Sequence, residues 1–181
     1  MNNLNEKEEG DLFGLFEGDG YKLYDKKSRH YQVEYYLNSL SDKPIISYLI
    51  SLLNKLCLRY FLYQDKRFNC KRIRVYSKHL FEIIDKNILI ESKSNDFCLG
   101  YVSGLIDSEG YVNNKKGYIM VINTNYSALD QCKRFLEKEG VSSSIKFRKL
   151  SKKDKKKSYR MYISVSFKNK PNLSIKTKKA G

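Results

Sequence analysis

The sequence has few of the residues that form covalent cross-links or bind transition metals. It contains four cysteines and two histidines in 181 residues. The cysteines, at positions 57, 70, 98 and 132, form no CxxC pair, so we expect free thiols and a reducing intracellular compartment, such as the cytoplasm, the nucleoid or an organelle matrix. His30 and His79 are isolated in the sequence, which argues against a zinc site. Gly-rich phosphate loops and nucleophile elbows are also absent.

Long apolar runs are missing as well. The most hydrophobic window, residues 45–63, is interrupted by Asn54, Lys55 and Arg59, whereas a membrane-spanning helix needs about 20 apolar residues. The first residues have no apolar core, so we expect no signal peptide. We therefore expect no membrane partner.

Acidic residues are strongly outnumbered by basic ones. The chain has 35 Lys and Arg against 20 Asp and Glu, a formal net charge of +15. Such an excess on a chain of this size predicts a polyanionic partner, with nucleic acid as the first candidate.

A nine-residue phrase occurs twice, as LFGLFEGDG at Leu12–Gly20 and as VSGLIDSEG at Val102–Gly110. Each copy has small residues four apart, which lie on one face of a helix and let two helix backbones approach closely. Each copy closes with a glycine, which predicts a helix end in the left-handed conformation. The repeat therefore predicts two similar halves whose phrase helices pack together.

The last acid of each phrase, Asp19 or Glu109, stands at a helix C-terminus, where the helix dipole disfavours negative charge. If the helices pack side by side, the two acids also repel each other. A hard divalent cation such as Mg²⁺, held by one or two carboxylates and substrate phosphates, would relieve both effects. The alternative is two ordinary Gly-capped helices with solvated acids, and the repeated register of small and acidic residues argues against it.

Hydrophobic periodicity predicts an α+β fold in which each half runs α-β-β-α-β-β. We expect residues 1–10 to be a loose lead-in, with Asp11 as the N-cap of the first helix. Residues 91–95 are a polar linker between halves at 11–90 and 96–181, and the closing helix of the second half is uncertain. The other expected helices are 41–57, 79–89, 96–109 and 126–139, and the expected strands are 21–24, 31–38, 60–64, 72–76, 119–122, 144–149 and 159–167.

The polar faces of these strands carry residues that can read base edges in the DNA major groove. The alternative is a solvated sheet face, but arginine is frequent on these polar faces and two such faces are predicted. Lysines at 152–157 suggest a loop that contacts phosphate. Candidate DNA-binding residues are Arg29, Gln32, Glu34, Tyr36, Asn38, Arg72, Arg74, Lys146, Arg148, Arg160 and Tyr162. Lys71 is grouped with Arg72 and Arg74.

The two phrases resemble the LAGLIDADG motif of the homing endonucleases, and two copies in one chain resemble its monomeric, pseudo-symmetric members. The resemblance implies two αββαββα-like halves, a central pair of packed motif helices and two antiparallel sheets forming a saddle over DNA. It assigns metal binding to Asp19 and Glu109, beside Gly18 and Ser108.

The resemblance also implies a polar residue and a lysine around the attacking water. Asn123 matches the polar position in the second half. The match in the first half falls near Leu40, with Asn38 as the nearest polar candidate. Lys115 or Lys116 could be the lysine. Glu17 and Asp107 precede the metal positions by two residues and are interpreted as salt-bridged or solvated acids near the helix interface.

By resemblance, the expected function is a site-specific homing endonuclease that makes metal-dependent double-strand breaks in a long DNA target, encoded within an intron or intein. Two or more Mg²⁺ ions would serve, and Mn²⁺ could substitute. The alternative is an RNA splicing maturase, with intron RNA as ligand, or a non-catalytic DNA-binding regulator on the same fold. A generic basic RNA-binding domain would leave the repeated acid-Gly phrase unexplained.

Overall fold

The computed structural model describes residues 4–65, 68–84, 86, 88–148 and 157–164. The predicted order α-β-β-α-β-β occurs twice, with a short helix closing the first half. In the first half these elements are α1 (Glu6–Asp19), β1 (Gly20–Asp25), β2 (His30–Asn38), α2 (Lys43–Lys55), β3 (Tyr60–Asp65), β4 (Cys70–Tyr76) and α3 (Lys78–Ile83). A 3₁₀ turn, η1 (Ile90–Ser92), leads to α4 (Asn95–Glu109), β5 (Gly110–Asn113), β6 (Tyr118–Asn123), α5 (Tyr126–Lys138), β7 (Ser143–Phe147) and β8 (Tyr159–Ser164).

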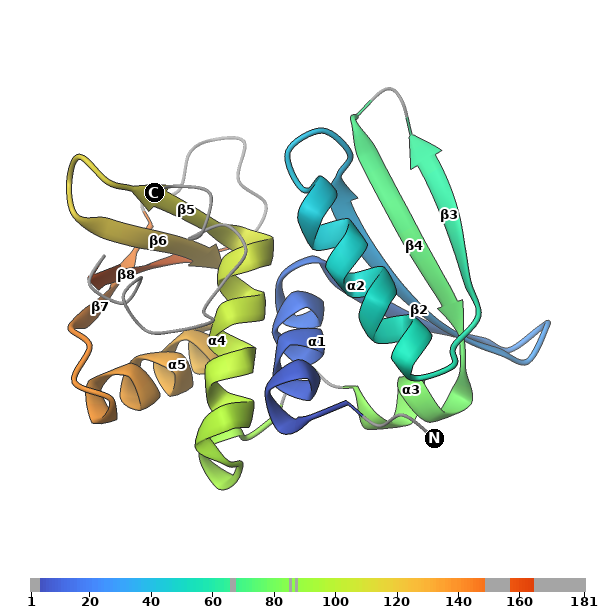
Figure 1. Cartoon of the computed structure of the whole chain (residues 1–181), viewed down its shortest axis with the longest axis horizontal. Helices are drawn as coiled ribbons and strands as arrows, with labels where there is room; N and C mark the ends of the chain where they lie inside the picture. Colours follow the sequence, from blue (N-terminus) through green and yellow to red (C-terminus); the bar gives the residue numbers. More distant parts are fainter. Residues whose placement is uncertain (1–3, 66–67, 85, 87, 149–156, 165–181) are drawn as a thin grey trace.

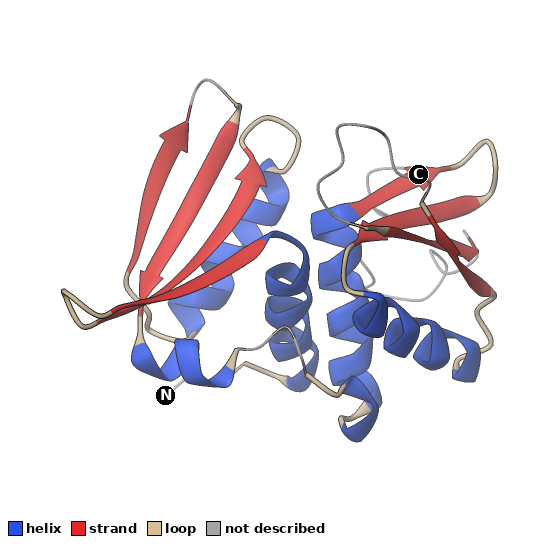
Figure 2. Ribbon diagram, turned by 180° about the vertical axis from the view of Figure 1, so that it is seen from behind, coloured by secondary structure: helices blue, strands red, loops and turns tan. Residues whose placement is uncertain are grey.

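Each half contains one four-stranded antiparallel sheet, in the order β1-β2-β4-β3 or β5-β6-β8-β7. Helices α1 and α4 pack against each other at the centre, and the two sheets lie on either side of them (Figure 1). Figure 2, from behind, shows the first sheet with its open face toward the viewer and its helices beyond it. The mixed α+β architecture predicted from the sequence is therefore confirmed.

Period-two alternation gives each sheet one apolar face, as predicted. Val33, Tyr35 and Leu37 of β2 are at most 2% exposed, and Ile73 and Val75 of β4 are fully buried beside them. These side chains form the core together with the apolar residues of the helices. In the described part of the chain, no helix is long and apolar enough to cross a membrane, and the four cysteines are free thiols.

The interface between α1 and α4 brings the two helix backbones into contact. A Cβ atom on Gly14 would lie 2.1 Å from the carbonyl oxygen of Tyr101, and one on Gly104 would lie 2.3 Å from that of Asp11. Gly10 and Gly100, which precede the repeated phrase, make equally close approaches to the opposite helix. The small-residue face predicted from the phrase therefore extends one turn further toward the N-terminus of each helix.

Three local predictions are wrong. Helix α1 begins at Glu6, because the Asn5 side chain accepts from the Glu8 N–H at 2.8 Å and the Glu8 carboxylate accepts from the Asn5 N–H at 3.2 Å. This capping box replaces the expected loose lead-in, so Asp11 lies inside the helix and is not its cap. The helix expected at 79–89 ends at Ile83. The uncertain closing helix lies outside the described residues.

The polar interior of the helix pair is centred on Asp11, which is 2% exposed. Its carboxylate accepts hydrogen bonds from Lys7 Nζ at 2.9 Å and from the Tyr48 hydroxyl at 2.6 Å. Burial, opposed by these partners and reinforced by the nearby Asp107 carboxylate, raises the pKa of Asp11 to about 6. Asp11 is therefore a neutralisable charge inside the central interface.

Gly14→Ala tests the backbone contact. The added methyl group would collide with the backbone of α4, so we expect a loss of about 3 kcal/mol or more in the free energy of unfolding. Gly18→Ala is the matched comparison: its Cβ would meet side-chain atoms of Ser108 and Glu109 and not the backbone of α4, so its loss of stability should be smaller. Urea denaturation of both variants measures the difference. Equal stability of the two variants would contradict this account of the interface.

Asp11→Asn tests the buried charge. The pKa of Asp11 rises from its ordinary 3.8 to about 6 on folding, so the folded state holds this proton more tightly than the unfolded state. The free energy of unfolding should therefore fall by up to about 3 kcal/mol as the pH rises from about 4 to 6. The variant should lack this component and be more stable than wild type at pH 8. Urea denaturation across this range measures it, and identical pH slopes would refute it.

Candidate active site

The C-terminal ends of the two motif helices meet. A Cβ atom on Gly18 would lie 2.0 Å from the Ser108 hydroxyl oxygen and 2.9 Å from Cγ of Glu109. Gly18, Ser108 and Glu109 are therefore brought together from opposite halves of the chain, as the repeated phrase predicted. The small residue at position 18 leaves room for the Glu109 side chain at the end of α1.

The closing glycines do not adopt the predicted left-handed conformation. Gly20 has φ −90° and Gly110 has φ −83°, so both are extended and begin the next strand directly. Glycine is needed there for space, because a Cβ on Gly20 would lie 2.1 Å from the ring of Phe16. A Cβ on Gly110 would lie 2.3 Å from the carbonyl oxygen of Ile106. The missing side chains let each helix turn sharply into its sheet.

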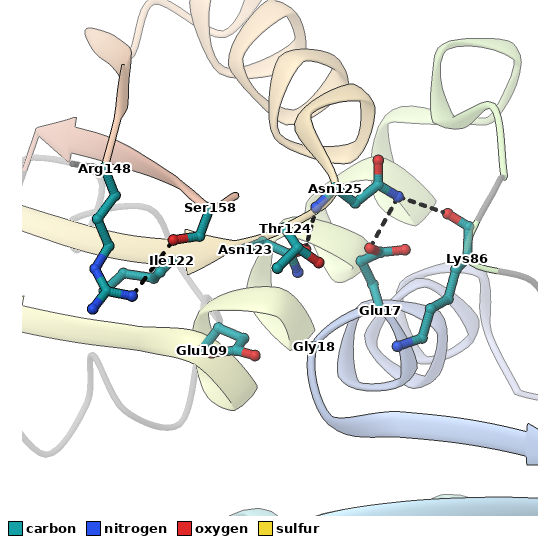
Figure 3. Close-up of a pocket in the computed structure, with 10 residues that line it drawn as sticks. All are labelled: Glu17, Gly18, Lys86, Glu109, Ile122, Asn123, Thr124, Asn125, Arg148 and Ser158. Atoms are coloured by element: carbon teal, nitrogen blue, oxygen red, sulfur yellow. Dashed lines mark hydrogen bonds between the residues drawn. The ribbon is translucent and has the colours of Figure 1, made fainter. Parts of the chain in front are cut away.

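A cavity of about 440 Å³ opens beside these helix ends. Figure 3 shows Glu109 between Arg148 and Ser158 of the second half, on one side, and Glu17 and Lys86 of the first half, on the other. The cavity thus joins a motif acid to polar groups and two cations, Lys86 and Arg148. Its lining residues are Glu17, Gly18, Lys86, Glu109, Ile122, Asn123, Thr124, Asn125, Arg148 and Ser158.

A partly buried set of hydrogen bonds supports one wall of this cavity. The Asn125 side-chain amide donates to Glu17 Oε1 at 3.1 Å and to the carbonyl oxygen of Lys86 at 3.2 Å (Figure 3). The Asn123 side-chain oxygen accepts from the Asn125 backbone N–H at 2.8 Å. Glu17 is only 2% exposed and Asp107 only 3%. Both acids lie at the helix interface, as predicted, but the solvated alternative is excluded because both carboxylates are packed inside the helix pair.

Asp19 is half-buried and does not line the cavity that contains Glu109. Its charge acts on Cys70 at the start of β4: burial, then Asp65 and then Asp19 raise the pKa of that thiol. The two motif acids thus belong to adjacent ends of the helix pair but face different surroundings. Asp19 lies toward the first sheet, whereas Glu109 lies toward the second.

The two halves also differ where the strand after each motif ends. Gly110 pairs with Val121, and Asn123 follows two residues later on the buried face, 8% exposed. Gly20 pairs with Tyr35, so the equivalent residue in the first half is Leu37. The expected match near Leu40 is therefore displaced, and Leu37 is apolar. Asn38 lies on the opposite, open face, where its side-chain oxygen accepts from the Leu40 and Ser41 N–H groups.

The predicted lysines lie away from the cavity. Lys115 and Lys116 are exposed in the turn between β5 and β6, and neither lines the space around Glu109. Lys86, which the sequence reasoning missed, comes from the connection between the halves and reaches across the Phe16 ring, with Nζ 5.5 Å from its centroid. Its only sequence signal was a basic residue shortly before the polar linker. Thr124, Asn125 and Ser158 were missed as well.

The predicted DNA-binding residues lie largely on the open faces of the two sheets. The pairing register puts Glu34 opposite Arg74 and Tyr36 opposite Arg72 on the first sheet, and Arg160 opposite Lys146 on the second. Arg29 is exposed in the turn between β1 and β2. Lys71 pairs with Leu37 and so has the opposite orientation. Gln32 and Asn38 share the open face of the first sheet, Tyr162 shares that of the second, and Arg148 lines the cavity.

The donor atoms at the helix ends suit a hard cation. Asp19 and Glu109 supply carboxylates, and the Gly18 and Ser108 carbonyl groups are further oxygen donors. The described residues contain no cluster of three His, Cys, Asp or Glu side chains, so the protein alone offers an incomplete oxygen shell. Mg²⁺ suits such a site, because water and substrate phosphates commonly complete its coordination.

Comparison with known proteins agrees with this architecture. Residues 96–169, which include the second motif, match the family model of the LAGLIDADG-like domain. An uncharacterised protein from Methanocaldococcus jannaschii is 28% identical over 149 residues, covering 74% of this chain. The chain spans 55% of the length of that relative.

Solved structures share the fold over nearly the whole chain. The homing endonuclease I-DmoI in complex with DNA and Mn superposes with a TM-score of 0.68 at 24% identity, covering 88% of this chain and 90% of its own. Mesophilic variants of I-DmoI give 0.74 at 20% identity, covering 97% of both chains. Full-length WhiA from Thermotoga maritima gives 0.69 at 16% identity, covering 96% of this chain and 58% of its own. Residues 96–169 therefore match a LAGLIDADG-like domain, and the chain as a whole has the fold of I-DmoI.

Proposed function

We propose that this protein is a site-specific DNA endonuclease that makes divalent-metal-dependent double-strand breaks in a long target, encoded within an intron or intein and acting in a reducing intracellular compartment. The observation that carries the proposal is the meeting of the two motif helix ends, where Gly18 contacts Ser108 and Glu109. Each helix ends in an acid, and an open sheet face bearing arginines flanks each helix. One acid for each DNA strand accounts for the need for two motifs.

The groups at the helix ends divide the work of phosphodiester hydrolysis. Asp19 and Glu109, with the carbonyl oxygens of Gly18 and Ser108, would hold Mg²⁺ or Mn²⁺. When bound, such an ion polarises the phosphate, lowers the pKa of a water molecule and stabilises the leaving oxygen. Lys86 offers a second positive charge for the scissile phosphate in the cavity that Glu109 lines. The Asn125–Glu17 hydrogen bond fixes the last turn of α1 and thereby Gly18.

The open sheet faces would hold double-stranded DNA. A net charge of +15 supplies the long-range attraction, and two antiparallel sheets offer side chains at the spacing of base edges in the major groove. The protein would act as a monomer, because both motif helices and both sheets come from one chain. Its two unlike halves would then suit an asymmetric target.

A non-catalytic nucleic-acid binder on the same fold, either an RNA splicing maturase or a transcription regulator, is the second candidate. One observation favours it: Leu37 stands in the first half where the second half has the polar Asn123. The first half therefore lacks one group that could orient an attacking water. Intron RNA would be the ligand of the maturase form.

Asp19→Asn and Glu109→Gln separate these candidates. If each acid holds metal for one strand, either change should slow double-strand cleavage by at least about 100-fold, since a metal ion contributes several kcal/mol to the transition state. Binding in Ca²⁺ should change little. The assay is cleavage of a plasmid library of randomised targets in Mg²⁺ or Mn²⁺, with Glu137→Gln, an exposed acid on α5, as control. Wild-type cleavage by either single mutant would refute the assignment, and binding without any cleavage would favour the non-catalytic candidate.

Lys86→Met tests the cation in the cavity. Loss of a charge-assisted contact to the scissile phosphate should slow cleavage by about 10- to 100-fold, with DNA affinity nearly unchanged. Lys115→Met and Lys116→Met are the matched controls, since both lysines lie outside the cavity and should affect affinity at most. Single-turnover cleavage at saturating protein measures the rate. A larger defect in either control than in Lys86→Met would restore the original prediction.

A further inference from the structure

A carboxylate is buried on a sheet face that none of the described helices covers. Glu34 of β2 lies on the open face of the first sheet, yet it is only 2% exposed. Its cross-strand neighbours are Tyr21 on β1 and Arg74 on β4. Since the helices pack on the other face, side chains of the sheet itself must cover this acid.

Glu34 is the hub of a polar network. Arg74 Nε donates to Glu34 Oε1 at 2.5 Å, and Arg72 Nε lies 3.6 Å from the same oxygen. The Tyr36 hydroxyl donates to Glu34 Oε2. Arg74 also donates from Nη1 to the Tyr76 hydroxyl at 3.0 Å. One acid thus holds two guanidinium groups side by side, where they would otherwise repel each other.

An aromatic ring braces the same two arginines. The central guanidinium carbons of Arg72 and Arg74 lie 4.7 Å and 5.1 Å from the centroid of the Tyr63 ring, within the range of cation–π attraction. The side chains of Arg72 and Arg74 remain 34% and 19% exposed. Each arginine therefore points its Nε toward Glu34 while part of its surface stays open to a ligand.

The network is confined to the first half. Met120 of β6 occupies the position of Glu34 in the second sheet, because it pairs with Tyr111 on one side and Tyr162 on the other. The cations Lys146 and Arg160 of that sheet therefore have no acid at the corresponding position. A negative charge weakens phosphate binding. The placement of Glu34 among DNA-facing arginines therefore needs a reason other than affinity for DNA.

We propose that Glu34 is a positioning residue that makes the first sheet discriminate between base pairs. This inference rests on the proposed function. By fixing Arg72 and Arg74, Glu34 presents their Nη groups to base edges and keeps them from swinging to phosphates. Paired donors on arginine suit the O6 and N7 acceptors of guanine, and prior fixing reduces the entropy lost on binding. The recognised element is therefore a guanine-containing step in the half-site under the first sheet.

The test is selection of bound duplexes from a randomised DNA library in Ca²⁺, which requires no cleavage. Wild type should show guanine preference at a few adjacent positions of one half-site. Glu34→Gln should reduce that preference about 10-fold and leave the other half-site unchanged, because a good arginine–guanine pair is worth about this much. It should also bind non-specific duplex several-fold more tightly, with a steeper salt dependence, as the released arginines reach phosphates.

Three further variants isolate the cause. Glu34→Asp keeps the charge but withdraws the carboxylate, so guanine preference should fall while non-specific affinity stays near wild type. Arg74→Lys keeps the positive charge but removes the planar guanidinium group, so this variant should also lose the guanine preference. It supplies the test if Glu34→Gln does not fold. Glu137→Gln removes one surface acid on α5 and should change neither property.

The outcomes separate the two proposals. If wild type selects a target and Glu34→Gln, or Arg74→Lys in its place, selects the same target with the same preference, Glu34 has no positioning role. Equal loss in both half-sites would also overturn it, because that pattern reports general destabilisation. A wild-type protein that selects no duplex sequence would overturn the proposed function and this role together.

Discussion

The contact between the backbones of α1 and α4 is the constraint on which the rest of the structure depends. Gly14 and Gly104 let each helix touch a carbonyl oxygen of the other, which leaves no side chain between the helices at these two positions to act as a soft spacer. Protein interiors are close-packed and have low compressibility, so such a contact fixes the distance between the two backbones. Backbone contact at these glycines therefore sets the spacing of the two helices, on which the meeting of their C-terminal ends depends.

This close interface encloses acids whose charged form has a lower free energy in water than in a protein interior. Asp11, Glu17 and Asp107 are each at most 3% exposed, and burial of a carboxylate requires compensating partners. Asp11 has Lys7 and Tyr48, whereas Glu17 has Asn125 at the start of α5. The second of these contacts matters for the site, because it ties the last turn of α1 to the second half. The same polar interior that weakens the interface therefore holds the cavity wall in place.

The sequence was sufficient where the signal is periodic or repeated. Periodicity predicted the strand at 31–38, whose buried face is Val33, Tyr35 and Leu37. The repeated phrase predicted that the motif helices pack together, and their ends meet at Gly18, Ser108 and Glu109. The sequence failed where the partner is distant in sequence: the burial of Glu34 depends on Arg74 across the sheet, and the position of Lys86 depends on its contact with Phe16 of α1. The capping box at Asn5 is local and readable, but the polar composition of residues 1–10 concealed it. Gly20 was judged by its frequency at helix ends, although steric contact with Phe16 is what requires glycine.

The departures from pseudo-symmetry indicate a division of labour between the halves. The second half combines Glu109 with a polar cavity and Asn123, whereas the first half has Leu37 at the equivalent place and a fixed arginine pair around Glu34 on its open face. A symmetric dimer could not separate these tasks, since any change would appear in both copies. Joining two motifs in one chain removes that restriction. The first sheet can then discriminate more strongly between bases, while the second half keeps the polar groups around Glu109. The helix contact is common to both and must stay unchanged while the sheets diverge.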